Sequence, residues 1–273
     1  EERTKANRKI GLGIMGFADA LLLLGLPYDS EAALAVGEKL MGFISTEAEA
    51  ESCRLAECRG AFPNYALSIF ASQGARRRNA SITTIAPTGT ISLIAGCSSG
   101  IEPLFAVCYA RQVLGERREF ATHPLLEQMA GQYLTDDVRR EISRTGSLQN
   151  VKQIPQSIRR LFVTAHDIDP EWHVRMQAAF QRHVDSAVSK TVNLRREATP
   201  KDIARIYLLA HQFGCKGITV FRDGCKEDQV LTPGTAEAPM PAGAQICPEC
   251  GGPMEHASAC VNCLSCGYTF CTI

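Results

Sequence analysis

The sequence predicts an α/β domain followed by a flexible linker and a small cysteine-rich tail of the zinc-ribbon kind. Three observations lead to this prediction. A strand, a helix and a second strand follow one another in residues 187–222; residues 231–245 hold few side chains that could build a core; and six of the 12 cysteines fall in 246–273. Alternating strands and helices are typical of a parallel sheet covered by helices.

The totals limit the classes of function. With 29 Lys and Arg against 29 Asp and Glu, no nucleic-acid partner is expected. The best candidate for a membrane span, Ala18–Leu26, is too short to cross a bilayer, so no membrane association is expected either. The opening Glu1–Lys5 lacks the features of a secretory signal and reads like the interior of a chain. We therefore expect a cytoplasmic protein and a part of a longer one.

Three glycines, Gly11, Gly13 and Gly16, match the spacing Gly-x-Gly-x-x-Gly of a dinucleotide-binding turn. That fingerprint requires a preceding strand and a later acidic residue in a βαβ unit. No strand is predicted before Gly11. The glycines are therefore interpreted as small residues that allow an apolar helix to pack closely.

The middle of the chain carries clear helix signals. A long helix is expected from the N-cap Ser30 to a stop at Gly60. A second helix opens at Asp169 with a proline at its first position, and Trp172, Met176, Phe180 and Val184 form one apolar stripe along it, which is typical of core packing. Between these helices, Ser81–Ala86 has the β-branched alternation of a buried strand.

The segment 187–222 is predicted to be a βαβ unit. It contains the strand Val188–Leu194, a helix with Thr199 as N-cap and Gly214 as its stop, and the strand Gly217–Phe221. The chain then divides into a barrel-type domain over 1–230, a flexible linker over 231–245 and a tail over 246–273.

A hydroxyl-rich turn follows the strand Ser81–Ala86 and leads into a predicted short helix, Ser92–Ala95. A strand, a small turn and a helix N-terminus direct free backbone N–H groups and hydroxyls at one point, which suits an anion such as phosphate. An ordinary capped turn is the alternative interpretation. The residues expected to contact the anion are Pro87, Thr88, Gly89, Thr90, Ile91 and Ser92.

Four tail cysteines form two Cys-x-x-Cys-Gly turns. Each turn directs two thiolates at one ion, so a tetrahedral zinc site is predicted, with disulfides or a simple redox pair as the alternative. So short a segment cannot fold on apolar burial alone, and the metal would supply its folding energy. The predicted zinc ligands are Cys247, Cys250, Cys263 and Cys266.

The other six cysteines carry no motif. They are scattered through apolar or predicted helical segments. Most are expected to be buried thiols without a catalytic or metal-binding role, because free cysteine packs as a small hydrophobe. They are Cys53, Cys58, Cys97, Cys108, Cys215 and Cys225.

Three segments together resemble ribonucleotide reductases. Thr84–Ser92 with Cys97–Pro103 is similar to the loop that holds the substrate diphosphate in that family. Arg8–Asp19 and Gly217–Cys225 resemble the same family in the same order, and the likeness covers nearly the whole chain. The cysteine-rich tail after a linker is similar to the adenosylcobalamin-dependent class.

The resemblance implies the later part of a ten-stranded α/β barrel. It also implies thioredoxin-dependent reduction of ribonucleoside di- or triphosphates to deoxyribonucleotides by a thiyl radical, with adenosylcobalamin as cofactor, and it is compatible with a homodimer. The Asn-x-Cys-x-Glu loop that carries the family's radical cysteine does not occur in the 273 residues. We expect the radical centre upstream of Glu1 and no turnover by this chain alone.

The resemblance also gives the tail a redox role. In the similar enzymes a mobile dithiol enters the active site and reduces the disulfide left by each turnover, which requires an accessible thiolate on a mobile carrier. Cys260 and Cys271 are the cysteines that the predicted zinc site does not use. The assignment stays open, because Cys263 or Cys266 could be redox members while Cys260 or His256 binds zinc. Two idle thiols are the remaining alternative.

Two further functions compete with this one. The first is a zinc-ribbon module that binds nucleic acid or protein and is attached to an unrelated α/β domain. The neutral charge and the few aromatic residues of the tail, Tyr268 and Phe270, weigh against a nucleic-acid surface. The second is the large subunit of a reductase that uses an iron or other metal cofactor.

Overall fold

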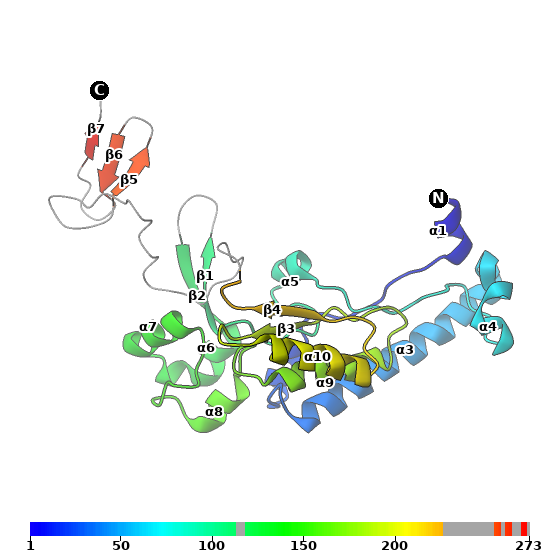
Figure 1. Cartoon of the computed structure of the whole chain (residues 1–273), viewed down its shortest axis with the longest axis horizontal. Coiled ribbons are helices and arrows are strands. Elements are labelled where there is room, and N and C mark those ends of the chain that lie inside the picture. Colours follow the sequence, from blue (N-terminus) through cyan, green and yellow to red (C-terminus); the bar gives the residue numbers. More distant parts are fainter. Residues whose placement is uncertain (113–117, 226–253, 258–259, 264–268, 272–273) are drawn as a thin grey trace. The chain divides into compact units, whose positions relative to one another are not determined.

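The computed structural model describes residues 1–112, 118–225, 254–257, 260–263 and 269–271 (Figure 1). The chain divides into two compact units, Glu1–Gly234 and Thr235–Ile273, each of which is described by itself. The predicted linker lies outside the described residues. The predicted boundaries at 231–245 therefore stay predictions.

The first unit contains helices and short strands. Its helices are α1 (Glu2–Asn7), α2 (Phe17–Leu23), α3 (Glu31–Arg59), α4 (Ile69–Ser72), α5 (Gly89–Ala95), α6 (Pro124–Ala130), α7 (Asp136–Thr145), α8 (Gln156–Leu161), α9 (Pro170–Gln181) and α10 (Pro200–Gln212), with single 3-10 turns at Pro63–Leu67 and Gly131–Tyr133. Its strands are β1 (Cys108–Gln112), β2 (Arg118–Thr122), β3 (Thr191–Leu194) and β4 (Thr219–Arg222). None of the helices in the described part of the chain is both long and apolar enough to cross a membrane.

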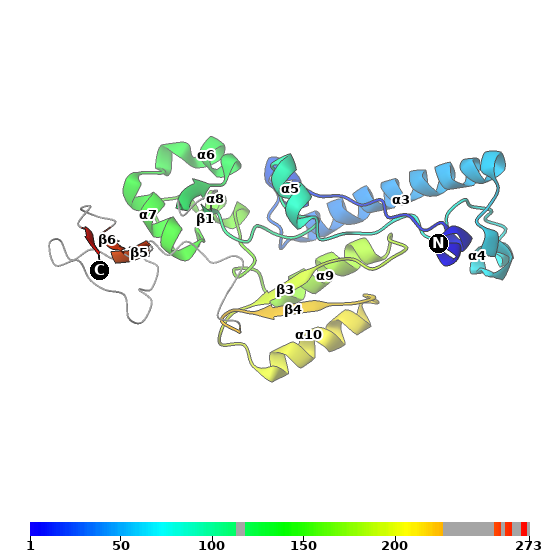
Figure 2. The ribbon, with the colours of Figure 1, turned by 90° about the horizontal axis from the view of Figure 1, so that it is seen from above.

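The predicted βαβ unit is present. Strand β3 pairs in parallel with β4, with Thr191 opposite Thr219, and α10 connects the two strands (Figure 2). The helix begins at Thr199, whose hydroxyl oxygen accepts a hydrogen bond from the amide of Asp202 in a full capping box. A short connection of this kind between parallel strands is typical of α/β barrels and open α/β sheets.

The parallel arrangement continues beyond β3. Residues 186–189 lie beside 83–85 through the parallel bridge Ile85–Val188, and 83–85 lie beside residues 10–12 through the parallel bridge Leu12–Thr83. Extended segments thus lie side by side in the order 10–12, 82–85, 186–194 and 219–222. The predicted strand at 81–86 is extended but forms only isolated bridges, because each neighbour is paired with it over a short stretch.

Glycines allow the first two segments to lie close together. A Cβ atom on Gly13 would lie 2.1 Å from the carbonyl oxygen of Thr84, and one on Gly11 would lie 2.5 Å from the Thr84 methyl carbon. The predicted close packing is therefore correct, but the predicted helix at these glycines is wrong. They belong to an extended segment, and α2 begins only at Phe17.

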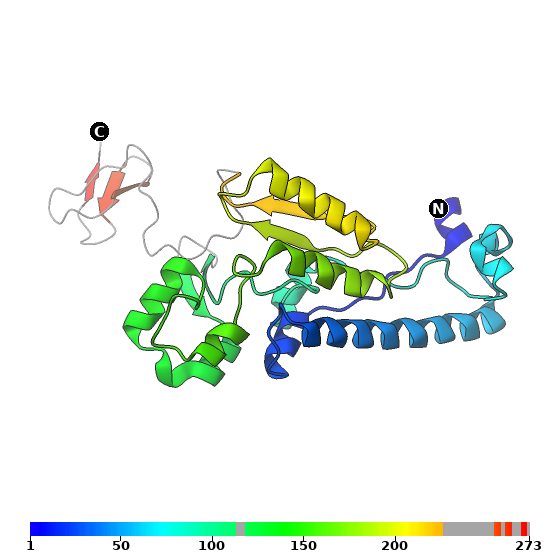
Figure 3. The ribbon, with the colours of Figure 1, turned by 60° about the horizontal axis from the view of Figure 1, so that its bottom comes forward.

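Helix α9 packs on β3, and the long helix α3 packs on α9 (Figures 2 and 3). The hydroxyl of Ser30 caps α3 by accepting a hydrogen bond from the Ala33 amide, and Gly60, with φ 78°, ends it. Met176 and Phe180 of α9 enter the main core, where Phe180 meets the Phe17 ring edge to face at 5.0 Å. The predicted capping signals and the apolar stripe are confirmed.

A second core joins the short helices. It contains apolar residues of α6, α7 and α8 and the side of α2 that bears Ala18 and Leu22, whereas Leu21 of α2 belongs to the main core. Helix α2 therefore connects the two cores. Because its apolar residues are split in this way, α2 has a fixed orientation at the start of the candidate site.

In the second unit, β5 (Met254–Ala257), β6 (Cys260–Cys263) and β7 (Thr269–Cys271) form an antiparallel sheet in that order. The register of β6 and β7 makes Cys260 the partner of Cys271.

Candidate phosphate-binding site

The predicted anion loop lies directly after the extended segment 82–85. Ala86 and Pro87 are exposed, Thr88 is the N-cap of α5, and the helix runs from Gly89 to Ala95. The sequence placed the start of this helix at Ser92, which is three residues too late. Thr90 and Ser92 consequently lie within the helix, and Gly89 is its first residue.

Thr88 adopts a backbone conformation that is rare for its residue type. Its φ of 54° and ψ of 24° lie in the left-handed region, which a β-branched residue seldom occupies. Such a conformation costs about 1–3 kcal/mol and persists only where the surroundings hold it. The hydroxyl oxygen of Thr88 accepts a hydrogen bond from the Gly100 amide at 2.7 Å, which provides part of that support.

The N-terminus of α5 has unpaired donors. The first amides of a helix have no intrahelical acceptor, and no side chain caps α5. Gly89, Thr90 and Ile91 are all exposed. A Cβ on Gly89 would meet no atom within 4 Å, so space for a ligand remains beside its backbone. The Thr88 hydroxyl, whose oxygen is used as an acceptor, keeps its proton for donation.

Ser92 lies beneath the loop. It is 1% exposed, its hydroxyl lies 2.9 Å from that of Ser99, and it donates to the carbonyl oxygen of Gly89 at 3.3 Å. This hydroxyl therefore joins α5 to residues 97–101. Its predicted contact with an anion stays a prediction.

Residues 97–101 form a second layer behind the loop, and α2 holds them in place. The Asp19 carboxylate accepts a hydrogen bond from the Ser98 amide at 2.6 Å, and the Gly16 amide donates to the Ser98 carbonyl oxygen at 2.7 Å. His123 Nε2 lies 3.0 Å from the other Asp19 carboxylate oxygen. Burial would raise the pKa of Asp19, but the hydrogen bonds from His123 and Ser98 outweigh it and lower that pKa.

An ion pair between a buried lysine and a partly exposed glutamate follows the second layer. Lys190, whose side chain is 0% exposed, places Nζ 2.7 Å from Glu102 Oε2, and the Thr191 amide donates to Glu102 Oε1 at 2.8 Å. Lys190 Nζ also lies 2.8 Å from His173 Nδ1 on α9 and donates to the Thr191 carbonyl oxygen at 2.6 Å. Glu102 is thereby bound to β3.

Burial shifts the pKa values of Lys190 and His173. It lowers the pKa of Lys190, although the Glu102 charge acts in the opposite direction. Burial, together with the Lys190 charge, holds the pKa of His173 well below its usual value. A neutral His173 can accept from Lys190 at Nδ1 and donate from Nε2 to the Ala165 carbonyl oxygen at 3.0 Å. Every hydrogen bond of the ion pair then has one donor and one acceptor.

Most of the predicted tail residues cannot be placed. Cys247, Cys250 and Cys266 lie outside the described residues, and of Cys260, Cys263 and Cys271 only the backbone is described. Among the described residues there is no group of three or more His, Cys, Asp or Glu that could hold a metal ion. The zinc and redox assignments therefore stay predictions.

The cysteines outside the tail are less buried than the sequence suggested. Cys108 is buried, Cys58 and Cys225 are exposed, and the others are partly exposed. The prediction that most are buried thiols is wrong. Cys58 and Cys225 lie near the ends of α3 and β4, outside the buried clusters of the described residues.

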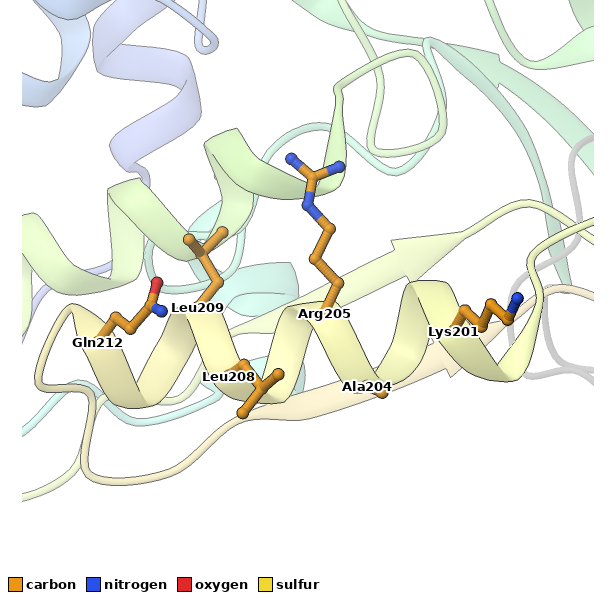
Figure 4. Close-up of a pocket in the computed structure, with 6 residues that line it drawn as sticks. All are labelled: Lys201, Ala204, Arg205, Leu208, Leu209 and Gln212. Carbon is orange, nitrogen blue, oxygen red and sulfur yellow. The ribbon is translucent and has the colours of Figure 1, made fainter.

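A surface pocket lies elsewhere in the first unit, along α10 (Figure 4). All the residues that line it, from Lys201 to Gln212, belong to this one helix, and Arg205 is engaged by Glu171 at 3.1 Å. It brings together no group of residues with catalytic chemistry, so the loop at α5 is the candidate site.

The sequence alone did not indicate the residues that hold the loop: Asp19, Tyr28, Glu102, His173 and Lys190. One signal was present. Lys190 lies in phase with the apolar Val192 and Leu194 of the predicted strand, and a lysine on the buried face of a strand requires an anionic or hydrogen-bonding partner. The identity of the partner was not accessible, because Glu102 is 88 residues away in the sequence.

Comparison with known proteins identifies a family and several relatives. A model of the family described as "Ribonucleotide reductase, barrel domain" matches residues 1–76 and 71–221. The vitamin B12-dependent ribonucleoside-diphosphate reductase of Thermoplasma acidophilum is 51% identical over 245 residues, covering 89% of this chain and 32% of the relative. The enzyme of the same name from Mycobacterium tuberculosis is 47% identical over 253 residues, covering 92% of this chain and 36% of the relative.

A solved structure has the same fold. The alpha subunit of the class Id ribonucleotide reductase of Actinobacillus ureae superposes with a TM-score of 0.70 at 22% identity, covering 81% of this chain and 40% of that one. This chain thus spans about a third of the length of the two B12-dependent relatives.

Proposed function

Because the chain belongs to the ribonucleotide reductase family by its barrel domain, we propose that it is the later part of the ten-stranded barrel of a thioredoxin-dependent ribonucleoside-diphosphate reductase. Such an enzyme converts ribonucleotides to 2′-deoxyribonucleotides. The names of the two B12-dependent relatives support adenosylcobalamin as the cofactor, which when bound would supply the radical that starts the reaction.

The observation that carries the proposal is the loop between segment 82–85 and α5. In α/β barrels, ligands bind outside the carboxyl ends of the strands, and this loop leaves such an end. It combines the unpaired amides of Gly89, Thr90 and Ile91 with a strained Thr88. Backbone amides at a helix N-terminus attract phosphate, so the loop would bind the di- or triphosphate of the substrate.

In this role the chain's own residues bind the phosphate of the substrate and orient its ribose. The Gly89 and Thr90 amides and the Thr88 hydroxyl would donate to phosphate oxygens. Substrate fixed in this way would present its ribose to the reacting groups in one geometry, which is a large part of catalysis. Pro87 and Ile91 would border the loop with apolar surface, since both are exposed.

For the tail we propose one zinc ion and one redox pair. Four thiolates in two Cys-x-x-Cys-Gly turns fit a structural zinc site in donor type and number. The ligands would be Cys247, Cys250, Cys263 and Cys266.

Cys260 and Cys271 would be the redox pair. The register of β6 and β7 makes them partners, and the Cα atoms of such partners lie about 4.5–5.5 Å apart, within the range that a disulfide bridges. In the exchange the tail dithiol becomes a disulfide and the active-site disulfide becomes a dithiol, so two electrons and two protons pass to the active site. Thioredoxin would then reduce the tail.

The two alternatives differ in their support. The family match removes the basis for a zinc module on an unrelated domain. A reductase with a metal-containing second subunit has the same barrel, as the Actinobacillus structure illustrates, but that likeness at 22% identity concerns the fold alone. The relatives at 51% and 47% identity favour the cobalamin-dependent class.

The experiment is an assay of the reductase that contains this chain. We expect cytidine diphosphate to be reduced when adenosylcobalamin and thioredoxin are supplied, with no second protein subunit. Reduction that proceeds without the cobalamin but needs a metal-containing subunit would assign the chain to the other class. Parallel assays with cytidine triphosphate would identify the preferred phosphate chain.

A further inference from the structure

Lys190 carries a fully buried charge, and all its donors are used. Its ammonium group contacts Glu102 Oε2, His173 Nδ1 and the Thr191 carbonyl oxygen at 2.7, 2.8 and 2.6 Å. An ammonium has three N–H donors and no acceptor. The three contacts therefore fix the position of Nζ completely and leave no donor for a ligand.

Glu102 is fixed just as fully. One carboxylate oxygen accepts from Lys190 and the other from the Thr191 amide at 2.8 Å. The two bonds differ in direction, so they set both the position and the rotation of the carboxylate. Glu102 is thereby bound to β3, on the strand next to the one that leads into the loop.

The connection from Glu102 to the loop is short. The next residue toward the N-terminus, Ile101, has its carbonyl oxygen held by the buried Tyr28 hydroxyl at 2.6 Å. The residue before that, Gly100, donates its amide to Thr88 Oγ1 at 2.7 Å. A Cβ on Gly100 would lie 3.0 Å from the Ala86 carbonyl oxygen, so the two layers are in direct contact. Gly100 is only two residues before Glu102 and is hydrogen-bonded to Thr88, so a displacement of Glu102 would be transmitted to Thr88 through Gly100.

Stability alone is a weak reason for this ion pair. Burying the Lys190 charge carries a desolvation cost that can equal its attraction to Glu102, whose side chain is 26% exposed, and apolar replacements of buried charges are often as stable. What the pair supplies is a defined geometry, and the neighbouring Thr88 has a conformation that requires outside support.

We propose that Lys190 and Glu102 are positioning residues that hold the loop in the conformation that binds the substrate phosphate. This role rests on the proposed function of the loop. Neither side chain touches the ligand; both act through Gly100 and Thr88.

The test measures equilibrium binding of cytidine diphosphate to the complete reductase that contains this chain. In Glu102→Gln, an NH2 group replaces one of the two carboxylate oxygens, so a donor faces either Lys190 Nζ or the Thr191 amide and one of the two hydrogen bonds is lost. We expect the Kd for cytidine diphosphate to rise about tenfold, as for the loss of one hydrogen bond to a charged group. The Kd for cytidine, which lacks phosphate, should stay within about twofold. Inorganic pyrophosphate should compete correspondingly less well.

Lys190→Met provides a second variant if Glu102→Gln folds poorly, and the same pattern of affinities is expected. The matched control is Arg77→Met. Arg77 is also buried, with Nη2 2.8 Å from Asp185, but it lies at the opposite end of the 82–85 segment from the loop. The Arg77→Met substitution should lower the Tm and leave the affinity for cytidine diphosphate unchanged.

The outcomes separate the two proposals. If Thr88→Ala weakens binding while Glu102→Gln and Lys190→Met bind like the wild type, the positioning role is overturned and the function of the loop stands. The positioning role is also overturned if the variants lose affinity for cytidine as strongly as for cytidine diphosphate. If Thr88→Ala leaves the affinity unchanged, the function proposed for the loop fails, and the positioning role fails with it.

Discussion

The Gly100 amide donates a hydrogen bond to the Thr88 hydroxyl oxygen at 2.7 Å. This bond joins the first layer of the candidate site to the second, and it holds a β-branched residue at a φ of 54°. It also orients the hydroxyl: because the oxygen accepts from Gly100, the proton points elsewhere. The Thr88 hydroxyl can therefore support the loop and donate to a ligand at the same time.

The first prediction concerns the hydroxyls of the loop. Thr88→Ala with Ser92→Ala should weaken binding of the nucleotide by about 1–3 kcal/mol, the usual cost of losing hydrogen bonds to a charged group. Thr88→Ser retains the hydroxyl and should bind nearly as well as the wild type. Titration of the complete reductase with cytidine diphosphate measures both. Unchanged affinity and turnover in the double variant would show that the loop does not bind phosphate.

The second prediction compares two glycines. Gly89→Ala adds a methyl group where no atom lies within 4 Å, so the Tm should not fall, yet the methyl group would occupy the space proposed for phosphate and weaken binding. Gly13→Ala would place its Cβ 2.1 Å from the Thr84 carbonyl oxygen. Because backbone must move, we expect a loss of about 3 kcal/mol in the free energy of unfolding. Thermal and denaturant unfolding distinguish the two, and a stable Gly13→Ala would contradict the close approach.

Local signals made much of the fold predictable. Ser30, Asp169 and Thr199 each cap the helix that the sequence assigned to them, because a cap depends on residues within one turn. The βαβ unit followed from the same kind of signal. The turn before α5 could be recognised for the same reason, since the extended segment, the turn and the helix are consecutive, and its anion-binding role stays a prediction.

The contacts that hold the loop join residues far apart in the sequence, so local sequence signals could not predict them. Glu102 and Lys190 are separated by 88 residues, and Asp19 and Ser98 by 79. The start of α5 was misplaced because Thr88 is an N-cap in the left-handed region without a capping side-chain bond. Gly11 and Gly13 were assigned to a helix because the residue that they contact, Thr84, is about 70 residues away in the sequence.

The third prediction concerns pH. Burial holds the pKa of His173 well below its usual value and keeps the ring neutral in the folded protein. In the unfolded chain the same ring takes up a proton near the ordinary histidine pKa of about 6.5. Below that pH the unfolded state binds more protons, so stability falls with falling pH by at most about 1.4 kcal/mol per unit from this group. The effect is absent above the unfolded pKa.

His173→Gln should reduce that slope between about pH 7 and pH 5, because glutamine does not titrate. Part of the slope should remain, since burial also lowers the pKa of His166. Denaturant unfolding across this pH range provides the measurement, and an unaltered slope in His173→Gln would show that His173 is accessible to protons in the folded state.

The fourth prediction is one zinc ion per chain, held by Cys247, Cys250, Cys263 and Cys266. Only these four have the spacing of paired Cys-x-x-Cys-Gly turns, and four thiolates complete a tetrahedral site. Metal analysis of protein prepared without chelator should find the ion, and Cys250→Ser should lose most of it. Absence of zinc, or its full retention in Cys250→Ser, would remove the zinc ribbon.

The last prediction separates a redox tail from a purely structural one. Cys260→Ser and Cys271→Ser should each retain zinc and a single turnover, because neither residue is a proposed zinc ligand or part of the barrel. Multiple turnover with thioredoxin should fail, since the active-site disulfide would no longer be reduced by the tail.

Dithiothreitol should restore much of the multiple turnover of these variants, because a small dithiol can reach the active site and exchange with the disulfide directly. A structural tail predicts the opposite pattern, in which loss of Cys260 or Cys271 leaves thioredoxin-supported turnover intact and loss of a zinc ligand unfolds the tail. The double variant Cys260→Ser, Cys271→Ser decides between them. If it turns over fully with thioredoxin, the register partnership of these two residues in β6 and β7 has no role in electron transfer, and the tail acts through its zinc site alone.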